Sequence, residues 1–225
     1  MRRAIGAVTI GQAPRTDVTF DIVLLLGEGV ELIEAGALDE LDAEGIASLA
    51  PEDDEPMLAS RLRDGRSVVV AERAVMPLVQ QALDRTVAQD ARAVILLCTA
   101  TAPSSLACEV PVIHPSMAIA EAVRAQAANG ELVAVMVPDQ AQVGDIGAHW
   151  NQMLGRPVDL YAASPYGPAD ARIAAAEQIA RTGASLIVLD CIGYSVEMGR
   201  EIERISGARV IVPRVVLAEA ARDAL

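Results

Sequence analysis

The sequence predicts an α/β fold built from two similar three-layer subdomains, whose parallel sheets are related by pseudo-twofold symmetry. Short β-branched runs alternate along the chain with alanine-rich amphipathic stretches, which is typical of strands joined by crossover helices. Two strand candidates, at 93–98 and 185–191, contain continuously apolar runs, as expected for central strands covered on both faces. With 225 residues and 52% apolar content, the chain is long enough to bury a core in each subdomain.

Each expected element follows from the local pattern and from the turn residues that bound it. The expected strands are 4–10, 30–34, 67–71, 93–98, 132–137, 158–161, 185–191 and 209–212. The expected helices are 16–26, 39–49, 72–89, 116–128, 139–154, 168–182, 195–205 and 213–224. Glycines follow three of these helices in the position of a C-cap, at Gly130, Gly183 and Gly207.

Two segments interrupt the alternation and suggest how the chain is divided. The acidic patch at 51–56 lies between two prolines and is expected to be an exposed turn. An extended stretch with two prolines, at 110–115, separates the halves. We therefore expect an N-terminal subdomain over residues 1–112, a C-terminal subdomain over 113–212, and a final helix over 213–225 that packs back on the N-terminal subdomain.

The two halves resemble each other around a pair of cysteines. Segments 91–98 and 184–191 each follow a predicted helix and end a buried strand, in Cys98 and in Cys191. Alanine, leucine and cysteine coincide when the two segments are superimposed. This repetition predicts a duplicated α/β unit.

Composition excludes several classes of function. All 18 basic residues are arginine, and the missing lysine rules out Schiff-base catalysis, covalent pyridoxal phosphate chemistry and a lysine-dependent P-loop. A net charge of −13 and only five aromatic residues argue against nucleic acid as a partner. One or two local arginines could still bind a small anionic or carboxylate-bearing substrate.

Cofactor, metal and membrane signals are also missing from the pattern. The first loop lacks the G-x-G-x-x-G spacing of dinucleotide sites, and two distant histidines without C-x-x-C make a zinc site improbable. No run of about 18 apolar residues predicts a membrane span. Three cysteines, an odd number, suit reduced thiols in a cytoplasmic protein. A homodimer is the default assembly, because twofold dimers are the commonest.

Cys98 and Cys191 are the leading candidates for catalytic residues. Ligands of open parallel sheets bind beyond the carboxyl ends of the strands, where both thiols are expected. Backbone N–H groups of the following residues could bind an anion and favour the thiolate form. These candidate substrate-binding residues are Thr99, Ala100, Thr101, Ile192, Gly193 and Tyr194.

Two facing thiols can perform a reaction that needs no lysine, histidine or metal. One removes a proton from a carbon stereocentre while the other delivers a proton to the opposite face, as in cofactor-independent racemases. The alternative is that these cysteines are small buried hydrophobic residues. Cys108 has no comparable context, and we expect it to be structural.

The loop after the first strand holds two further candidate substrate-binding residues. Arg15 could bind a carboxylate with its forked guanidinium, and Gln12 could donate an amide hydrogen bond. An arginine at a helix N-terminus is electrostatically disfavoured, which hints at a function. The alternative is a solvated arginine paired with Asp17 or another surface acid.

The remaining candidates are weaker. Ser116 could bind substrate, but it is also well placed to be the N-cap of a helix. His114 is expected to be an ordinary interdomain histidine, and His149, beside Trp150, to have a structural role. Tyr166 lies in a proline-rich loop that either borders the site or turns the chain. A serine–histidine–acid triad has no supporting G-x-S-x-G motif.

Three motifs together resemble the AroM family, through the whole chain. They are Thr-Ile-Gly-Gln-Ala-Pro-Arg-x-Asp at 9–17, Leu-Leu-Cys-Thr-Ala at 96–100 and Val-Leu-Asp-Cys-Ile-Gly at 188–193. That family looks like a branch of the aspartate/glutamate/hydantoin racemase superfamily, whose members share two similar α/β subdomains with the active site between them. The resemblance implies that Cys98 and Cys191 occupy the two catalytic cysteine positions.

Details of the motifs refine this resemblance. Cys191-Ile192-Gly193 is similar to the Cys-x-Gly of hydantoin racemases. Amino-acid racemases commonly carry Cys-Asn-Thr at the first site, whereas this chain has Cys98-Thr99-Ala100 and lacks that asparagine.

The sequence-based hypothesis is a cofactor-independent, racemase-like enzyme acting on a small carboxylate, amino-acid derivative or hydantoin-like compound. Cys98 and Cys191 would form its acid–base pair. One alternative is a single-cysteine decarboxylase, cis–trans isomerase or lyase of the same superfamily. Another is a non-catalytic binding or sensor protein that retains the site.

Overall fold

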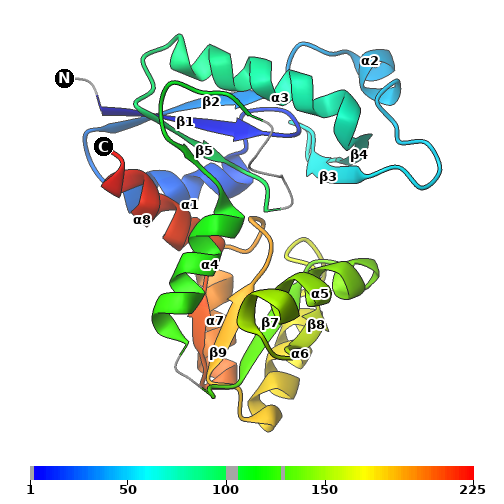
Figure 1. Cartoon of the computed structure of the whole chain (residues 1–225), viewed down its shortest axis with the longest axis vertical. Helices are drawn as coiled ribbons and strands as arrows, with labels where there is room; N and C mark the ends of the chain where they lie inside the picture. Colours follow the sequence, from blue (N-terminus) through cyan, green and yellow to red (C-terminus); the bar gives the residue numbers. More distant parts are fainter. Residues whose placement is uncertain (1–2, 100–105, 128–129) are drawn as a thin grey trace. The chain divides into compact units, whose positions relative to one another are not determined.

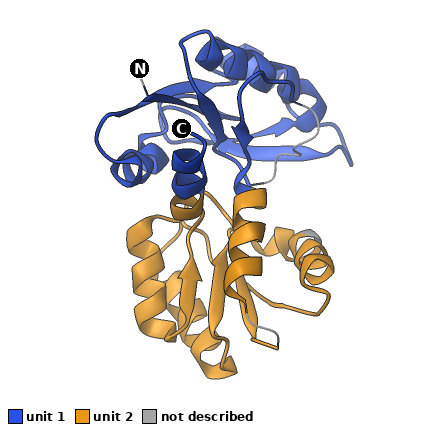
Figure 2. Cartoon of the chain, turned by 60° about the vertical axis from the view of Figure 1, so that its left-hand side comes forward, with its two compact units in different colours: residues 1–115, 217–225 blue, residues 116–216 orange. Residues whose placement is uncertain are grey.

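The computed structural model describes residues 3–99, 106–127 and 130–225, and the chain divides into two compact units. Unit 1 comprises residues 1–115 together with 217–225, and unit 2 comprises residues 116–216 (Figure 2). The chain therefore leaves unit 1 once and returns to it within its last helix, whose residues 213–216 still belong to unit 2. Each unit contains its own parallel sheet.

Unit 1 is built around a four-stranded sheet in the order β2-β1-β5-β6. All neighbouring strands are parallel, and residues of β1 pair with both β2 and β5. Figure 1 shows helix α3 on one face of this sheet and helix α1 on the other. The elements are β1 (Arg3–Thr9), α1 (Thr16–Leu26), β2 (Val30–Gly36), α2 (Ala43–Ala47), β3 (Met57–Arg61), β4 (Ser67–Ala71), α3 (Glu72–Val87), β5 (Ala93–Leu96) and β6 (Val112–Ile113).

Unit 2 contains a second parallel sheet, in the order β10-β9-β7-β8. Its central strands β7 and β9 are completely buried. The remaining elements are α4 (Pro115–Gln126), β7 (Val133–Val137), the 3-10 helix η2 (Gln140–Gln142), α5 (Val143–Leu154), β8 (Asp159–Ala162), α6 (Ala169–Thr182), β9 (Leu186–Leu189), α7 (Val196–Ser206), β10 (Arg209–Ile211) and α8 (Pro213–Asp223).

The two sheets have the same topology. The strand order is β2-β1-β5-β6 in unit 1 and, read in the matching direction, β8-β7-β9-β10 in unit 2. In both sheets the strand that comes first in the sequence lies between the second and the third, and the fourth lies at the edge beside the third. Strands β5 and β9 therefore hold equivalent positions, and both lead into a cysteine two residues beyond the strand. This confirms the predicted α/β class with two similar units.

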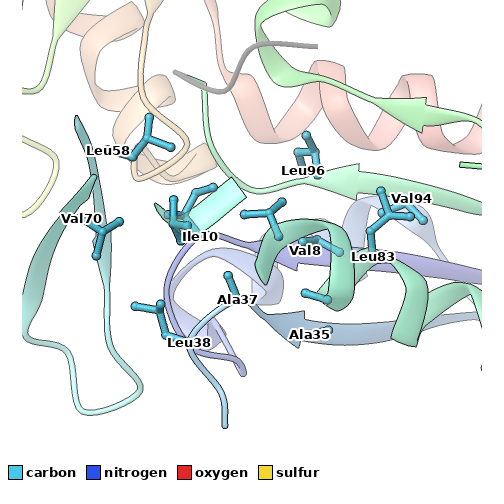
Figure 3. Close-up of a cluster of buried hydrophobic side chains, with 13 residues drawn as sticks. Val8, Ile10, Ala35, Ala37, Leu38, Leu58, Val70, Leu83, Val94 and Leu96 are labelled. Carbon is cyan, nitrogen blue, oxygen red and sulfur yellow. The ribbon is translucent and has the colours of Figure 1, made fainter. Parts of the chain in front are cut away.

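The core of unit 1 shows why an apolar sequence pattern is needed on both sides of a strand. Val8, Ala35 and Val94 come from three neighbouring strands and pack with Val79 and Leu83 of α3 (Figure 3). All five side chains are almost completely buried. Burying surface of this kind contributes about 25 cal/mol per Å², so α3 stabilises the sheet that positions Cys98.

Two expectations in the first half are corrected by the structure. Residues 57–61 form β3, which pairs antiparallel with β4, although the acidic turn before them obscured the pattern. The helix expected over 39–49 is reduced to α2, because the Asp39 carboxylate accepts hydrogen bonds from the N–H groups of Gly36 and Ala13. Those bonds hold the chain in a turn until Asp42 caps the helix through the N–H of Gly45.

Gly6 of β1 lies where α3 comes close to the sheet. A Cβ at this position would be 2.6 Å from Thr86 Oγ1 and 2.8 Å from Thr86 Cβ. We expect Gly6→Ala to destabilise the protein by about 1–3 kcal/mol, because it overpacks this contact. The urea midpoint, followed by circular dichroism, measures the effect.

Gly144→Ala is the matched control, since a Cβ there meets nothing within 4 Å. It lies within α5, where alanine favours the helix by up to about 1 kcal/mol. A Gly6→Ala midpoint at or above that of the parent would contradict the packing described.

Candidate active site

Cys98 and Cys191 follow the equivalent strands β5 and β9, each two residues after the strand ends. Both side chains are half-buried, and none of the three cysteines forms a disulfide. In a parallel sheet this edge is where side chains can leave the buried strands and meet a ligand. The structure therefore places a thiol just beyond the carboxyl end of a central strand in each unit.

The chain after Cys191 folds back on the cysteine. The N–H of Gly193 donates to Cys191 Sγ at 3.4 Å, and the N–H of Tyr194 donates to the Cys191 carbonyl at 3.2 Å. The turn therefore directs one backbone N–H at the sulfur, and a donor in that position favours a thiolate over a thiol. The Ile192 side chain is also buried. An anion bound to this predicted segment would therefore contact backbone groups and not the side chain of Ile192.

The Tyr194 side chain is inaccessible. Its ring is completely buried, and its hydroxyl donates to the Ala163 carbonyl. Burial raises the pKa of the Tyr194 hydroxyl, and the nearby Cys191 raises it further. The hydroxyl therefore holds its proton and ties the Cys191 segment to the loop after β8.

Asp190 precedes Cys191 and is a half-buried acid directly after the apolar strand β9. Its carboxylate accepts a hydrogen bond from Trp150 Nε1 at 2.7 Å. Burial raises the pKa of Asp190, while the hydrogen bond from Trp150 and the charge of His149 oppose that rise. His149 is exposed on α5, and its ring lies edge-on to Trp150 at 6.1 Å between centroids.

On the other unit, Cys98 packs against the edge of the core cluster formed by α3 and the sheet. Thr99 is half-buried beside it. Ala100 and Thr101, which the sequence predicted to bind substrate through their N–H groups, lie outside the described residues. Cys108 also packs against this core cluster, in keeping with a structural role.

The loop after β1 is held by contacts within unit 1. Gln12 Nε2 donates to the Leu38 carbonyl at 3.2 Å, and Gln12 Oε1 accepts from the N–H of Arg63 at 3.2 Å. Arg63 Nε donates to the Ala13 carbonyl at 2.7 Å. Arg63 follows β3, so the hairpin that the sequence pattern missed holds the loop that carries Gln12.

Arg15 is buried rather than solvated, with only 3% of its surface exposed. Its Nε and a terminal nitrogen donate to the two carboxylate oxygens of Asp17, at 2.8 and 2.9 Å. A further nitrogen donates to Thr9 Oγ1 at 3.3 Å. The forked guanidinium, which was predicted to bind a substrate carboxylate, here binds the carboxylate of the first turn of α1.

Three further residues singled out from the sequence lie near the ends of strands. His114 directly follows β6, the neighbour of β5, and is buried. Its Nδ1 has no hydrogen-bond partner among the described residues, and burial lowers the pKa of His114. Ser116 is the second residue of α4, which begins at Pro115, so it is inside the helix and is not the N-cap. Tyr166 lies against Gly193, where an added Cβ would be 2.8 Å from its ring.

Two buried arginines of unit 2 escaped the sequence analysis. Arg214 Nε donates to the Ile192 carbonyl at 2.8 Å, and its NH2 donates to the Gly193 carbonyl at 2.7 Å. Arg172 donates to the Gly167 carbonyl at 3.1 Å. The sequence did carry a signal for Arg214, because a Pro-Arg pair at 213–214 begins the predicted last helix, much as the pair at 14–15 precedes the predicted first one.

Among the described residues, no group of three or more His, Cys, Asp and Glu side chains could hold a metal ion. Over the same part of the chain, every helix is too short or too polar to cross a bilayer.

The desolvated carboxyl of Asp190 gives a prediction about how the stability of the protein depends on pH. The pKa of Asp190 is higher in the folded than in the unfolded protein. The protein therefore loses stability as the pH rises from the unfolded-state pKa through the folded-state pKa. Asp190→Asn keeps an acceptor for Trp150 and removes this loss. We expect the variant to melt a few degrees above the parent at pH 8, with a smaller difference at pH 4.

Asp159→Asn, at an exposed site on β8, is the control for the substitution itself. An Asp190→Asn variant that is no more stable than the parent at pH 8 would show that Asp190 is not a desolvated acid.

Comparisons with known proteins agree with this geometry. A search of curated proteins finds no match. Allantoin racemase from Klebsiella pneumoniae superimposes with a TM-score of 0.65 at 13% identity, covering 98% of this chain and 86% of that one. Unliganded arylmalonate decarboxylase gives 0.62 at 16% identity, with 99% and 92% covered.

A cysteine-to-serine mutant of Nocardia farcinica maleate cis-trans isomerase, with a covalently bound succinylcysteine intermediate, gives a TM-score of 0.62 at 14% identity, covering 99% and 92%. These similarities show a shared fold. The family model described as AroM protein matches residues 5–225. The chain therefore belongs to the AroM family, and it shares its fold with a racemase, a decarboxylase and an isomerase.

Proposed function

We propose that this protein is a cofactor-independent, cytoplasmic enzyme that uses Cys98 and Cys191 as an acid–base pair on a small carboxylate-bearing substrate. The observation that carries this proposal is topological. Two thiols lie at equivalent sheet edges of two units with the same strand order. The structural neighbours named as a racemase, a decarboxylase and an isomerase favour the same class of chemistry.

In the proposed reaction, one cysteine acts as a thiolate and removes the proton from the carbon next to the carboxylate. The electron pair moves into the carboxylate, which becomes an enediolate. The other cysteine, as a thiol, gives its proton to the opposite face of the same carbon. The substrate thus changes configuration, and the two cysteines exchange protonation states.

The turn after Cys191 supports the thiolate role. A backbone N–H already donates to its sulfur, and the rest of the segment is fixed by buried contacts. Stabilising charge with fixed dipoles is effective because they need no reorganisation during the reaction. Gln12 and Arg15 form hydrogen bonds within unit 1. We propose that they orient the substrate indirectly, because these bonds fix the conformation of the loop after β1.

Solvent hydrogen exchange tests this function directly. We expect the wild-type protein in D₂O to place deuterium on the α-carbon of one compound in a panel of amino acids, malonates, hydantoins and allantoin. Cys98→Ala and Cys191→Ala should each reduce the exchange rate about 100-fold or more, since each removes one proton-transfer group. Mass spectrometry and proton NMR measure the incorporation.

Cys108→Ala is the control and should exchange at the wild-type rate, because Cys108 packs against the core of unit 1. Exchange that persists in both active-site variants would contradict the thiol pair. Tight binding of a panel member with no turnover would instead identify a sensor that retains the site.

A single-cysteine mechanism is the second candidate, and it is favoured by the succinylcysteine in the maleate isomerase neighbour. In that case one thiolate adds to a carbon–carbon double bond and forms an S–C bond to the substrate. Intact-mass measurement on Cys98→Ala and Cys191→Ala with maleate separates the two. A covalent adduct on Cys191 of the first variant or on Cys98 of the second would favour this second mechanism.

A further inference from the structure

We propose that Arg214 is a positioning residue for Cys191, because its guanidinium holds the carbonyls of Ile192 and Gly193 and so directs the backbone N–H of Gly193 onto the cysteine sulfur. The inference rests on the proposed function only in taking Cys191 as the reactive group. All of the residues concerned lie in unit 2.

The placement of Arg214 is costly and therefore informative. It lies in the first turn of α8, where the positive end of the helix disfavours a cation. Only 2% of its surface is exposed, so its charge has lost most of its contact with water. Hydrogen bonds of 2.8 and 2.7 Å to two successive carbonyls offset part of that cost.

The geometry of the peptide bond links this contact to the sulfur. In a trans peptide the C=O and the N–H point in opposite directions. When the Ile192 and Gly193 carbonyls face Arg214, the N–H groups of Gly193 and Tyr194 must face away from it. Those two N–H groups donate to Cys191, one to Sγ at 3.4 Å and one to its carbonyl oxygen at 3.2 Å.

The same contact strengthens the donor electrostatically. A cation bonded to a peptide oxygen polarises the amide and makes its N–H a stronger donor. Arginine is suited to this role because its planar fork reaches two acceptors at once, which a lysine ammonium cannot match. Arg214 thus acts on Cys191 through the backbone, without contact with a substrate.

A second contact confines this turn. Gly193 is packed so closely against Pro165 and Tyr166 that an added Cβ would lie 2.8 Å from each. These residues restrict the space beside Gly193, and Arg214 restrains the two peptide groups through their carbonyls. The N–H of Gly193 is therefore held in its orientation before any ligand arrives.

Alkylation of Cys191 by iodoacetamide tests the proposal and needs no substrate. Cys98→Ser and Cys108→Ser leave Cys191 as the sole thiol, and rates measured from pH 5 to 10 give the midpoint of thiolate formation. We expect Arg214→Met to move this midpoint upward by about one pH unit. Alkylation at pH 7 should then slow about tenfold, because only the thiolate reacts.

Arg222→Met is the matched control, since Arg222 is an exposed arginine on the same helix. Its midpoint should equal that of the parent. Arg214→Lys keeps the charge but loses the fork, and we expect an intermediate midpoint. That variant also provides the comparison if Arg214→Met does not fold.

A profile of Arg214→Met or Arg214→Lys that superimposes on the parent, in a protein with unchanged circular dichroism, would overturn the proposal. Failure of the proposed function has a different signature. In that case no panel compound exchanges deuterium, while the dependence of Cys191 alkylation on Arg214 remains.

Discussion

Both sheets are parallel, and their central strands are buried on both faces; this constraint governs where the protein can carry out chemistry. Strands β5, β7 and β9 are buried along their whole length, so none of them can expose a polar side chain before it ends. Functional groups must therefore gather where the strands end. Cys98 and Cys191 both stand there, two residues beyond equivalent strands.

The edge of unit 2 is held by buried side chains that bond to the backbone. Arg214 binds the carbonyls of the Cys191 turn, and Arg172 binds the Gly167 carbonyl in the loop that packs on Gly193. In unit 1 the buried guanidinium of Arg15 binds Asp17 instead. Arg214 and Arg15 each bond through two or more nitrogens of one planar guanidinium, which a lysine ammonium could not match.

Much of the fold could be predicted from sequence because buried strands and amphipathic helices have distinct apolar periods. The helix at 16–26 and the strand at 67–71 have the predicted bounds. The strand at 57–61 was missed because its apolar residues follow an acidic turn, and the length of α2 depended on the contact of Asp39 with distant backbone. Contacts between residues far apart in sequence leave no local pattern.

The same distinction applies to the site. The two cysteines could be identified because they end recognisable strands, whereas the role of Arg214 depends on a contact with residues 21 and 22 positions earlier. Arg15 was singled out for its unusual place at a helix start, and the alternative that it pairs with Asp17 is confirmed, although the guanidinium is buried and not solvated. Residue type and spacing indicate which groups are unusual, while burial and partners decide what they do.

The central claim is that Cys98 and Cys191 act on opposite faces of one substrate carbon. A crystal structure with a bound planar analogue of the enediolate, taken from a compound that the protein turns over, tests this most directly. We expect both sulfurs at roughly 3–4 Å from the same carbon, one on each side of its plane. An analogue that contacts one sulfur only, with the other cysteine far from the carbon, would contradict it.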